Sequence, residues 1–233
     1  CRQMLELSCD MQAAVSEPDD APRGLVRLSV STSFGQAQLA EAMADYVKRY
    51  PLVSIDLQML DRTVNLVDER IDLAIRTSND LDPNLIARQL TVCRSVICAS
   101  PAYLQEHPQP QRVEELAGHN CLTHSYFGKS LWHFEEDGEP VSVPVHGNIS
   151  ANEASTLLRL TLAGAGVAML PTYQAGEYIR SGQLIRLLPH AEPRRMNMYA
   201  VYASRKHMPQ ALRSLLDFLV LRFPPEPQWD VGL

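Results

Sequence analysis

The spacing of hydrophobic residues in the first third of the chain alternates between two periods. Apolar residues at every second position, as in Val26, Leu28 and Val30, indicate a β-strand with one buried face. From Gln36 the apolar residues fall three and four positions apart, which is typical of one face of an α-helix. The predicted elements are a strand over 26–30, a helix from 36 to 47 that ends before Pro51, a strand over 53–59, a short helix at 66–67 and a strand over 71–75. Strands separated by helices in this order predict parallel pairing with right-handed crossovers.

The same theme recurs from residue 96. The run 96–99 is a predicted strand, and Ser100 followed by Pro101 is typical of a capped helix start. Asp137 and Gly138 lie between two alternating runs and predict a β-hairpin. The remaining predicted elements are a helix around 154–161 that Gly164 stops, a strand over 167–170 closed by Pro171, a strand over 196–203 and a last amphipathic helix over 212–223. The chain is therefore predicted to be α/β, with two subdomains of similar plan.

The first fifteen residues carry a short apolar stripe. Met4, Leu7, Met11 and Ala14 are three and four positions apart, which is the spacing of a coiled-coil seam. The end of a lone amphipathic helix explains the same pattern equally well. The run 16–22 contains two prolines and three acidic residues and is predicted to be a linker. A helix that begins without a cap is interpreted as the tail of a longer one.

Composition narrows the class of protein. The chain has 233 residues, of which 45% are hydrophobic and 21% charged, which is typical of one large globular domain or two small ones. No apolar run approaches the roughly 18 residues of a membrane-spanning helix, and residues 1–6 lack the plan of a secretory signal. Five cysteines without a paired framework, among them Cys93 and Cys98 as small buried residues, favour reduced thiols and a cytoplasmic location. A net charge of −6 argues against direct nucleic-acid binding by this chain.

The sequence contains no catalytic constellation. It has neither a G-x-S-x-G elbow nor a Walker loop, and the glycines of 164–166 follow a helix rather than a strand, unlike a dinucleotide fingerprint. His119, Cys121 and His124 have the spacing nearest to a metal site, but a single run without a second pair favours structural roles. No cofactor, metal or reaction type is therefore predicted.

Polar residues recur directly after the predicted strands. They are 31–33, 61–63 and 76–79 in the first half, and Ser100, Ser125-Tyr126 and Asn152-Glu153 in the second. Ligands of open parallel sheets bind beyond the carboxyl ends of the strands, where helix N-termini suit anions. Each hydroxyl alone could simply cap its own helix. Together they predict a site for a small anionic or strongly polar ligand, with Arg62 and Arg76 supplying charge, unless Arg76 only pairs with a neighbouring acid.

The order of these pieces resembles the effector-binding region of LysR-type transcriptional regulators, in the branch with a DLAIR strand. The matching segments are GLVRLS at 24–29, FG at 34–35, YP at 50–51, DLAIR at 72–76, VICASPAYL at 96–104, EL at 115–116, HNCL at 119–122, GAGVAMLP at 164–171 and GQLIRLL at 182–188. Their shared order is more specific than any one of them. One departure is Glu69-Arg70, since many members have a glycine just before the third strand.

The resemblance implies a fold and a set of partners. Such sensing regions are similar to type 2 periplasmic binding proteins, with two Rossmann-like subdomains joined by two crossover strands and a small effector between them. Members bind promoter DNA through an N-terminal winged helix-turn-helix, and a long linker helix pairs subunits into a homodimer or homotetramer. RNA polymerase is a further candidate partner; no cofactor and no membrane is implied. Residues 1–15 are interpreted as the end of the linker helix, so DNA contact is assigned to a winged domain outside this chain.

Carried over position by position, the family's effector contacts fall on Ser31, Thr32, Ser33, Arg62, Arg76, Ser100, Ser125, Tyr126 and Asn152. The polar residues after the second and third strands differ among members, so the resemblance implies no particular effector. The expected division is 1–22 for the end of the linker helix and hinge, 23–94 for subdomain I, completed by 202–223, 95–201 for subdomain II, and 224–233 for a C-terminal tail.

Three classes of function remain. The favoured one is the ligand-sensing and oligomerisation domain of a LysR-type regulator, which is not an enzyme. An exported solute-binding protein of the same fold is the second, and the coiled-coil-like start and reduced cysteines argue against it. A small α/β enzyme is the third, and the missing constellation argues against that.

Overall fold

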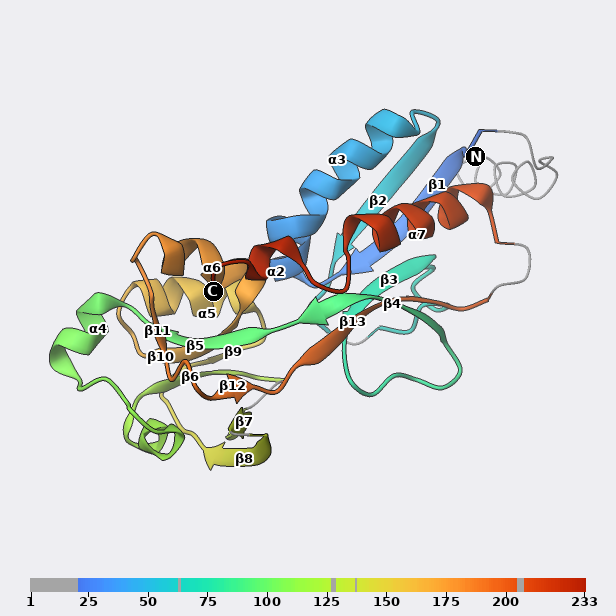
Figure 1. Cartoon of the computed structure of the whole chain (residues 1–233). Helices are drawn as coiled ribbons and strands as arrows, with labels where there is room; N and C mark the ends of the chain where they lie inside the picture. The colour runs from blue at the N-terminus through green and yellow to red at the C-terminus, as the bar shows by residue number, and fades with distance from the viewer. Residues whose placement is uncertain (1–20, 63, 127–128, 137, 205–207) are drawn as a thin grey trace. The chain divides into compact units, whose positions relative to one another are not determined.

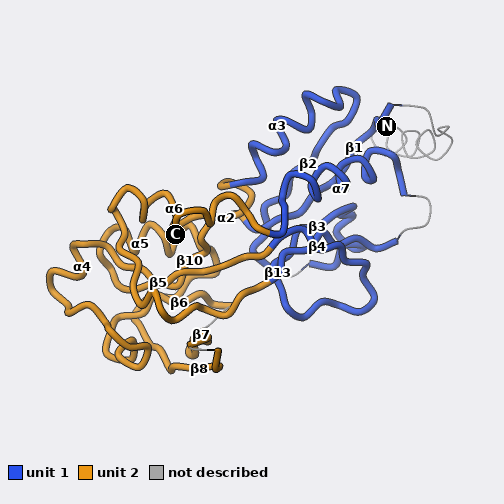
Figure 2. The backbone as a smooth tube through the Cα atoms, in the orientation of Figure 1, with its two compact units in different colours: residues 1–31, 38–91, 197–225 blue, residues 32–37, 92–196, 226–233 orange. Residues whose placement is uncertain are grey.

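The computed structural model describes residues 21–233, except 63, 127–128, 137 and 205–207 (Figure 1). The backbone forms two compact units, shown in different colours in Figure 2. Unit 1 comprises residues up to 31 together with 38–91 and 197–225, and unit 2 comprises 32–37, 92–196 and 226–233. The linker helix expected at the start lies outside the described residues. The expected subdomain boundaries at 94/95 and 201/202 remain predictions, because a division by packing does not define independently folding domains.

Unit 1 is built on a five-stranded sheet in the order β2-β1-β3-β13-β4. Its elements are β1 (Gly24–Val30), α3 (Ala40–Arg49), β2 (Val53–Met59), β3 (Leu73–Thr77), β4 (Ile86–Cys93), β13 (Met196–Tyr202) and α7 (Gln210–Arg222). β1 is parallel to both β2 and β3, which confirms the predicted pairing, whereas β13 is antiparallel to β3. β4 and β13 carry the chain across the unit boundaries at 91/92 and 196/197. The sequence pattern gives no prediction for β4.

Helices α3 and α7 cover one face of this sheet (Figure 1). The strand side chains beneath them, such as Leu28, are fully buried, which explains the alternating pattern of β1. Tyr46 of α3 is also fully buried, and its hydroxyl donates to the backbone oxygen of Ala211 at 3.1 Å and lies 2.7 Å from Ser214 Oγ of α7. The two helices are therefore joined by polar bonds as well as by apolar contact.

The short helix predicted at 66–67 is wrong, because residues 66–70 form turns. The side-chain oxygen of Asn65 accepts hydrogen bonds from the backbone N–H groups of Val67 at 3.0 Å and Asp68 at 3.4 Å. Such an Asx turn competes with helical hydrogen bonding. Arg70 follows with φ of 53°, in the left-handed region. Glycine adopts this conformation at low cost, which explains the glycine that many family members have just before the third strand.

Unit 2 contains a five-stranded sheet in the order β11-β5-β10-β6-β9 and a three-stranded sheet in the order β12-β7-β8. Its helices are α2 (Thr32–Phe34), α4 (Pro101–Glu106), α5 (Ala154–Leu162) and α6 (Thr172–Arg180), with the short helical segments η1 (Gly35–Leu39), which runs on into α3, η2 (Val113–Gly118) and η3 (Gln228–Asp230). Its strands are β5 (Ser95–Ala99), β6 (Cys121–His124), β7 (Leu131–Glu136), β8 (Glu139–Pro144), β9 (Ser150–Ala151), β10 (Val167–Pro171), β11 (Ile185–Leu187) and β12 (Glu192–Pro193).

The sheet of unit 2 is parallel only in part. β10 is parallel to β6, and β6 is parallel to β9, but β5 is antiparallel to both β10 and β11. β5 follows directly from β4 after Arg94, so its direction is set by the strand that brings the chain into the unit. The predicted hairpin is confirmed, since β7 and β8 pair in antiparallel register and Gly138 has φ of 83°.

A helix cap and a close backbone approach explain two of the sequence segments that resemble LysR-type regulators, 96–104 and 164–171. The predicted helix start at Ser100 is confirmed, because its Oγ accepts a hydrogen bond from the backbone N–H of Tyr103 at 3.3 Å. Gly166 lies so close to the next strand that an added Cβ would be 2.2 Å from the backbone oxygen of Asn120. In the described part of the chain, no helix is long and apolar enough to cross a membrane.

Candidate functional site

The carboxyl ends of three parallel strands meet at one edge of unit 1. Ser31 follows β1, Arg62 follows β2, and Arg76 lies near the end of β3. Because β1 is parallel to both neighbours, these three predicted contacts lie at the same edge. Ligands of open parallel sheets bind at such an edge.

Arg76 is the partly buried cation of this edge. Its Nη2 donates to Ser29 Oγ at 3.0 Å and its Nη1 donates to the backbone oxygen of Ile75 at 3.2 Å. Burial lowers the pKa of the Arg76 guanidinium, and the more distant Glu69 only partly opposes that effect. No carboxylate forms an ion pair with it among the described residues, and Glu69 acts on it only through its charge. A guanidinium has five N–H donors, so this one retains donors for an anion.

Arg62 is held differently. Its two terminal nitrogens donate to the two carboxylate oxygens of Glu69 at 2.7 and 2.9 Å. This forked hydrogen bond raises the pKa of Arg62. The Arg62 side chain is 56% exposed, so the pair adds little stability. An incoming anion would compete with Glu69 for Arg62, whereas Arg76 has no such competitor in a direct ion pair.

In unit 2 the short helix α2 contacts both α5 and α6. Ser33 of α2 is buried, and its Oγ lies 3.0 Å from the hydroxyl of Tyr173 in α6. Thr32 precedes it as the first residue of α2. The sequence pattern gives no prediction for α6 or for Tyr173, although a proline that closes a buried strand, as Pro171 does, is a signal for a following helix start.

Ser125 and Asn152 follow β6 and β9, which pair in parallel, so the two residues lie at one edge. Ser125 Oγ is 3.1 Å from Ser150 Oγ, and Tyr126 is 60% exposed. Asn152 is exposed. α6 starts at the same edge, because β10 is parallel to β6. This polar edge of unit 2 therefore includes Thr32, Ser33, Ser125, Tyr126, Asn152 and Tyr173.

Ser100 does not belong to that edge. It follows β5, which is antiparallel to β10, so it lies at the opposite end of the sheet from Ser125 and Asn152. Ser100 is 3% exposed, and its oxygen caps α4. Its structural role as a helix cap accounts for its presence.

The N-terminus of α5 already has an anionic partner within the chain. The Glu153 carboxylate accepts hydrogen bonds from the backbone N–H groups of Ser155 at 2.7 Å and Thr156 at 2.9 Å. Burial alone would raise the pKa of Glu153, but these hydrogen bonds lower it overall. A ligand anion is therefore not expected at this helix start, and the polar edge of unit 2 offers mainly hydroxyl and amide groups.

Two of the three residues with metal-like spacing, His119 and Cys121, are buried in the core. His124 is instead half-buried, and its Nδ1 accepts a hydrogen bond from the backbone N–H of Tyr126 at 3.2 Å. His119 Nδ1 lies 3.1 Å from the Tyr103 hydroxyl, and the buried Cys121 thiol donates to the backbone oxygen of Leu116 at 3.4 Å. Among the described residues, no three His, Cys, Asp or Glu side chains are grouped as metal ligands. Cys93, Cys98 and Cys121 are free and buried.

A family model described as the LysR substrate binding domain matches residues 19–224. The chain belongs to this family. The HTH-type transcriptional activator TtdR of Escherichia coli strain K12 is 31% identical to this LysR substrate-binding domain over 207 residues, which are 88% of the chain and 66% of TtdR. The HTH-type transcriptional regulator CrgA of Neisseria meningitidis is 33% identical over 217 residues, which cover 91% of the chain and 72% of CrgA. The chain thus spans slightly less than two thirds of TtdR.

Solved structures have the same fold. The CrgA regulatory domain from Neisseria meningitidis aligns with a TM-score of 0.77 and 30% identity, over 87% of this LysR substrate-binding domain and all of that chain. Full-length AphB of Vibrio cholerae aligns with a TM-score of 0.79 over 96% of the domain and 77% of AphB, at 24% identity. The predicted α/β fold, similar to type 2 periplasmic binding proteins, is confirmed.

Proposed function

We propose that this chain is the effector-sensing and oligomerisation part of a LysR-type transcriptional regulator, and that its effector is a small anionic or strongly polar molecule. The family assignment and the similarity to named HTH-type regulators support the class. DNA binding is assigned to a further domain of the whole protein, because this chain has a net charge of −6. Binding of the effector changes the oligomer and thereby transcription.

The observation that carries the proposal is the Arg76 guanidinium. It is partly buried at a strand-end edge, with one serine hydroxyl and one backbone oxygen as partners. A partly buried cation without a paired carboxylate loses part of its hydration, and such groups gather at functional sites. An effector carboxylate would complete its hydrogen bonds and neutralise its charge.

Other predicted contacts surround this anchor in unit 1. The hydroxyl of Ser31 lies at the same edge, and Arg62 becomes available when an anion displaces Glu69. The polar edge of unit 2 is proposed as a second effector-contact surface, with Thr32, Ser33, Ser125, Tyr126 and Asn152 as hydrogen-bonding groups. Ser100 is left out of this set because it caps α4.

The experiment compares the whole regulator with this chain in a gel shift on its own promoter. The whole protein is expected to bind the promoter specifically, and this chain is not. An anion that raises the melting temperature of the chain should alter promoter binding by the whole protein, and Arg76→Gln should abolish that response while promoter binding is kept. Specific binding by this chain alone would overturn the proposal.

Oligomerisation has a separate test. Light scattering of the chain at micromolar concentration should report a homodimer or a larger assembly, and the whole protein is expected to reach a homotetramer. A monomer in both preparations would contradict the oligomerisation part of the proposal. The effector site is tested separately, by the gel shift.

A further inference from the structure

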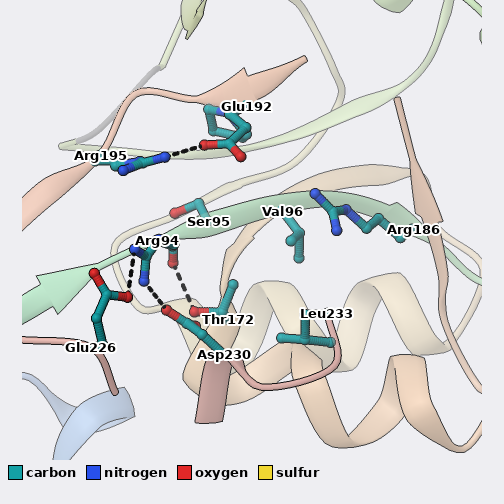
Figure 3. Close-up of a pocket in the computed structure, with 11 residues that line it drawn as sticks. Arg94, Ser95, Val96, Thr172, Arg186, Glu192, Arg195, Glu226, Asp230 and Leu233 are labelled. Carbon is teal, nitrogen blue, oxygen red and sulfur yellow. Dashed lines mark hydrogen bonds and ion pairs between the residues drawn. The ribbon is translucent and has the colours of Figure 1, made fainter. Parts of the chain in front are cut away.

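A cavity of about 240 Å³ lies within unit 2, and none of the predicted effector contacts lines it. β11 pairs with β5 only over Ile97–Ala99, so it does not cover the edge of β5 at Ser95 and Val96. The cavity opens at this uncovered edge (Figure 3). Its walls are Arg94, Ser95, Val96, Thr172, Arg186, Glu192, Pro193, Arg195, Glu226, Asp230 and Leu233.

Three arginines and three carboxylates line the cavity, and they are unevenly paired. Arg94 donates to Asp230 at 2.6 Å and to Glu226 at 2.9 Å. Arg195 donates to Glu192 at 2.7 Å. Every carboxylate of the lining is therefore engaged by an arginine.

Of the lining arginines, Arg186 is the one without a hydrogen bond to a described residue, although its charge, after the larger effect of Arg195, helps to lower the pKa of Glu192. It makes no hydrogen bond or ion pair among the described residues, and in Figure 3 it extends from β11 beside Val96 with no dashed line. It pairs in register with Cys98, so it projects from the same face of the sheet as Val96. The neighbouring Ser95 hydroxyl is likewise without a hydrogen bond in the part of the chain that the structure describes. The open polar groups of the cavity are thus the Arg186 guanidinium, the Ser95 hydroxyl and the buried Oδ1 of Asp230, which accepts no hydrogen bond among the described residues.

The charges around Arg186 restrict what it can bind. One oxyanion would complete the guanidinium, but the three carboxylates of the lining would repel a second negative charge. Val96, Pro193 and Leu233 offer apolar contact to the rest of a ligand. At about 30 Å³ for each water, a volume of 240 Å³ holds about eight waters, or a ligand of about eight non-hydrogen atoms.

We propose that this cavity is a second ligand site, distinct from the effector edge, and that it binds a small monocarboxylate with an apolar body. The carboxylate accepts forked hydrogen bonds from Arg186. The hydrocarbon part lies against Val96, Pro193 and Leu233.

Saturation-transfer NMR with hexanoate on this chain tests the site. The parent should bind with a Kd on the order of 1 mM, since one charge-assisted contact and a small apolar surface are gained. Arg186→Gln should weaken binding by about 10- to 150-fold, and inorganic phosphate should not compete with hexanoate. If Arg186→Gln has a lower melting temperature than the parent, Arg186→Lys replaces it as the test variant. Lysine keeps the positive charge but cannot make the two forked hydrogen bonds, so binding should still be several-fold weaker.

Two control variants separate this site from other sources of binding. Arg159→Gln makes the same chemical change at an exposed position of α5 and should leave hexanoate affinity unchanged. Arg88→Gln makes the change at an exposed position of unit 1 and should also leave it unchanged. The proposal is overturned if the parent does not bind, if Arg186→Gln binds like the parent, or if a control variant loses binding as Arg186→Gln does.

Discussion

The bond between Arg76 and Ser29 gives a measurable test of how the effector edge is built. Ser29 is fully buried, and its hydroxyl makes its one described hydrogen bond to the Arg76 guanidinium, at 3.0 Å. Arg76→Met keeps most of the side-chain volume but leaves that hydroxyl without a partner, which costs about 1–3 kcal/mol. Part of this cost is offset because a cation no longer has to be desolvated. The expected loss is about 1–2 kcal/mol, or about 2–8 °C in melting temperature for a chain of this length.

A double-mutant cycle isolates the interaction. Ser29→Ala removes the hydroxyl and leaves Arg76 bonded to the backbone of Ile75. In the double variant neither group is left unsatisfied, so its loss of stability should be smaller than the sum of the single losses by about 1–2 kcal/mol. Urea unfolding followed by circular dichroism measures all four proteins.

The outcome that refutes this reasoning is additivity within about 0.5 kcal/mol, because independent sites add to that accuracy. Arg88→Met is the control for removing an arginine. Arg88 pairs with Asp217 at 2.8 Å, but both side chains are well exposed. Its loss should therefore cost less than about 1 kcal/mol.

Three further predictions concern stability and reactivity. Gly166→Ala should cost at least about 2 kcal/mol in urea unfolding, because its Cβ would lie 2.2 Å from the backbone oxygen of Asn120; a loss below about 0.5 kcal/mol would contradict this. Burial, aided by the nearby His107, lowers the pKa of His119 below 6.5, so the unfolded chain binds a proton that the folded chain does not. Stability should then fall as the pH drops below about 6.5, and His119→Asn should make that slope shallower, which melting scans between pH 5 and 8 would show. Burial raises the pKa of the Cys93, Cys98 and Cys121 thiols to about 12, so these thiols stay protonated in the folded chain at about pH 8. They should therefore react with a thiol reagent only after the chain unfolds.

The hydrophobic pattern predicts most of unit 1 because its signals are local. The alternation in β1 and β2 and the helical spacing before Pro51 each depend on a few adjacent residues. The helix predicted at 66–67 is wrong because two apolar residues suggest a helix there, whereas the Asn65 side chain stabilises a turn. The pairing of β5 depends on how β4 enters unit 2, which no local pattern contains.

For the candidate site too, the sequence reveals local features but not contacts between distant segments. That polar residues follow the strands can be read from the sequence, and three of them do share an edge in unit 1. The sequence does not reveal that Arg62 pairs with Glu69 while Arg76 bonds to Ser29, because those contacts depend on side-chain directions across loops and strands. Nor does it reveal that Ser100 lies at the other end of its sheet, since that requires the antiparallel direction of β5.

Isothermal titration calorimetry measures whether Arg76 anchors a small anionic effector. A panel of small organic anions is first ranked by the rise in melting temperature of the chain, and the best member is titrated into the parent, Arg76→Gln and the exposed control Arg88→Gln. Loss of one charge-assisted contact should weaken binding to Arg76→Gln by about 10- to 150-fold, while Arg88→Gln binds like the parent. Equal affinity for Arg76→Gln and the parent, with both proteins folded, would contradict the account.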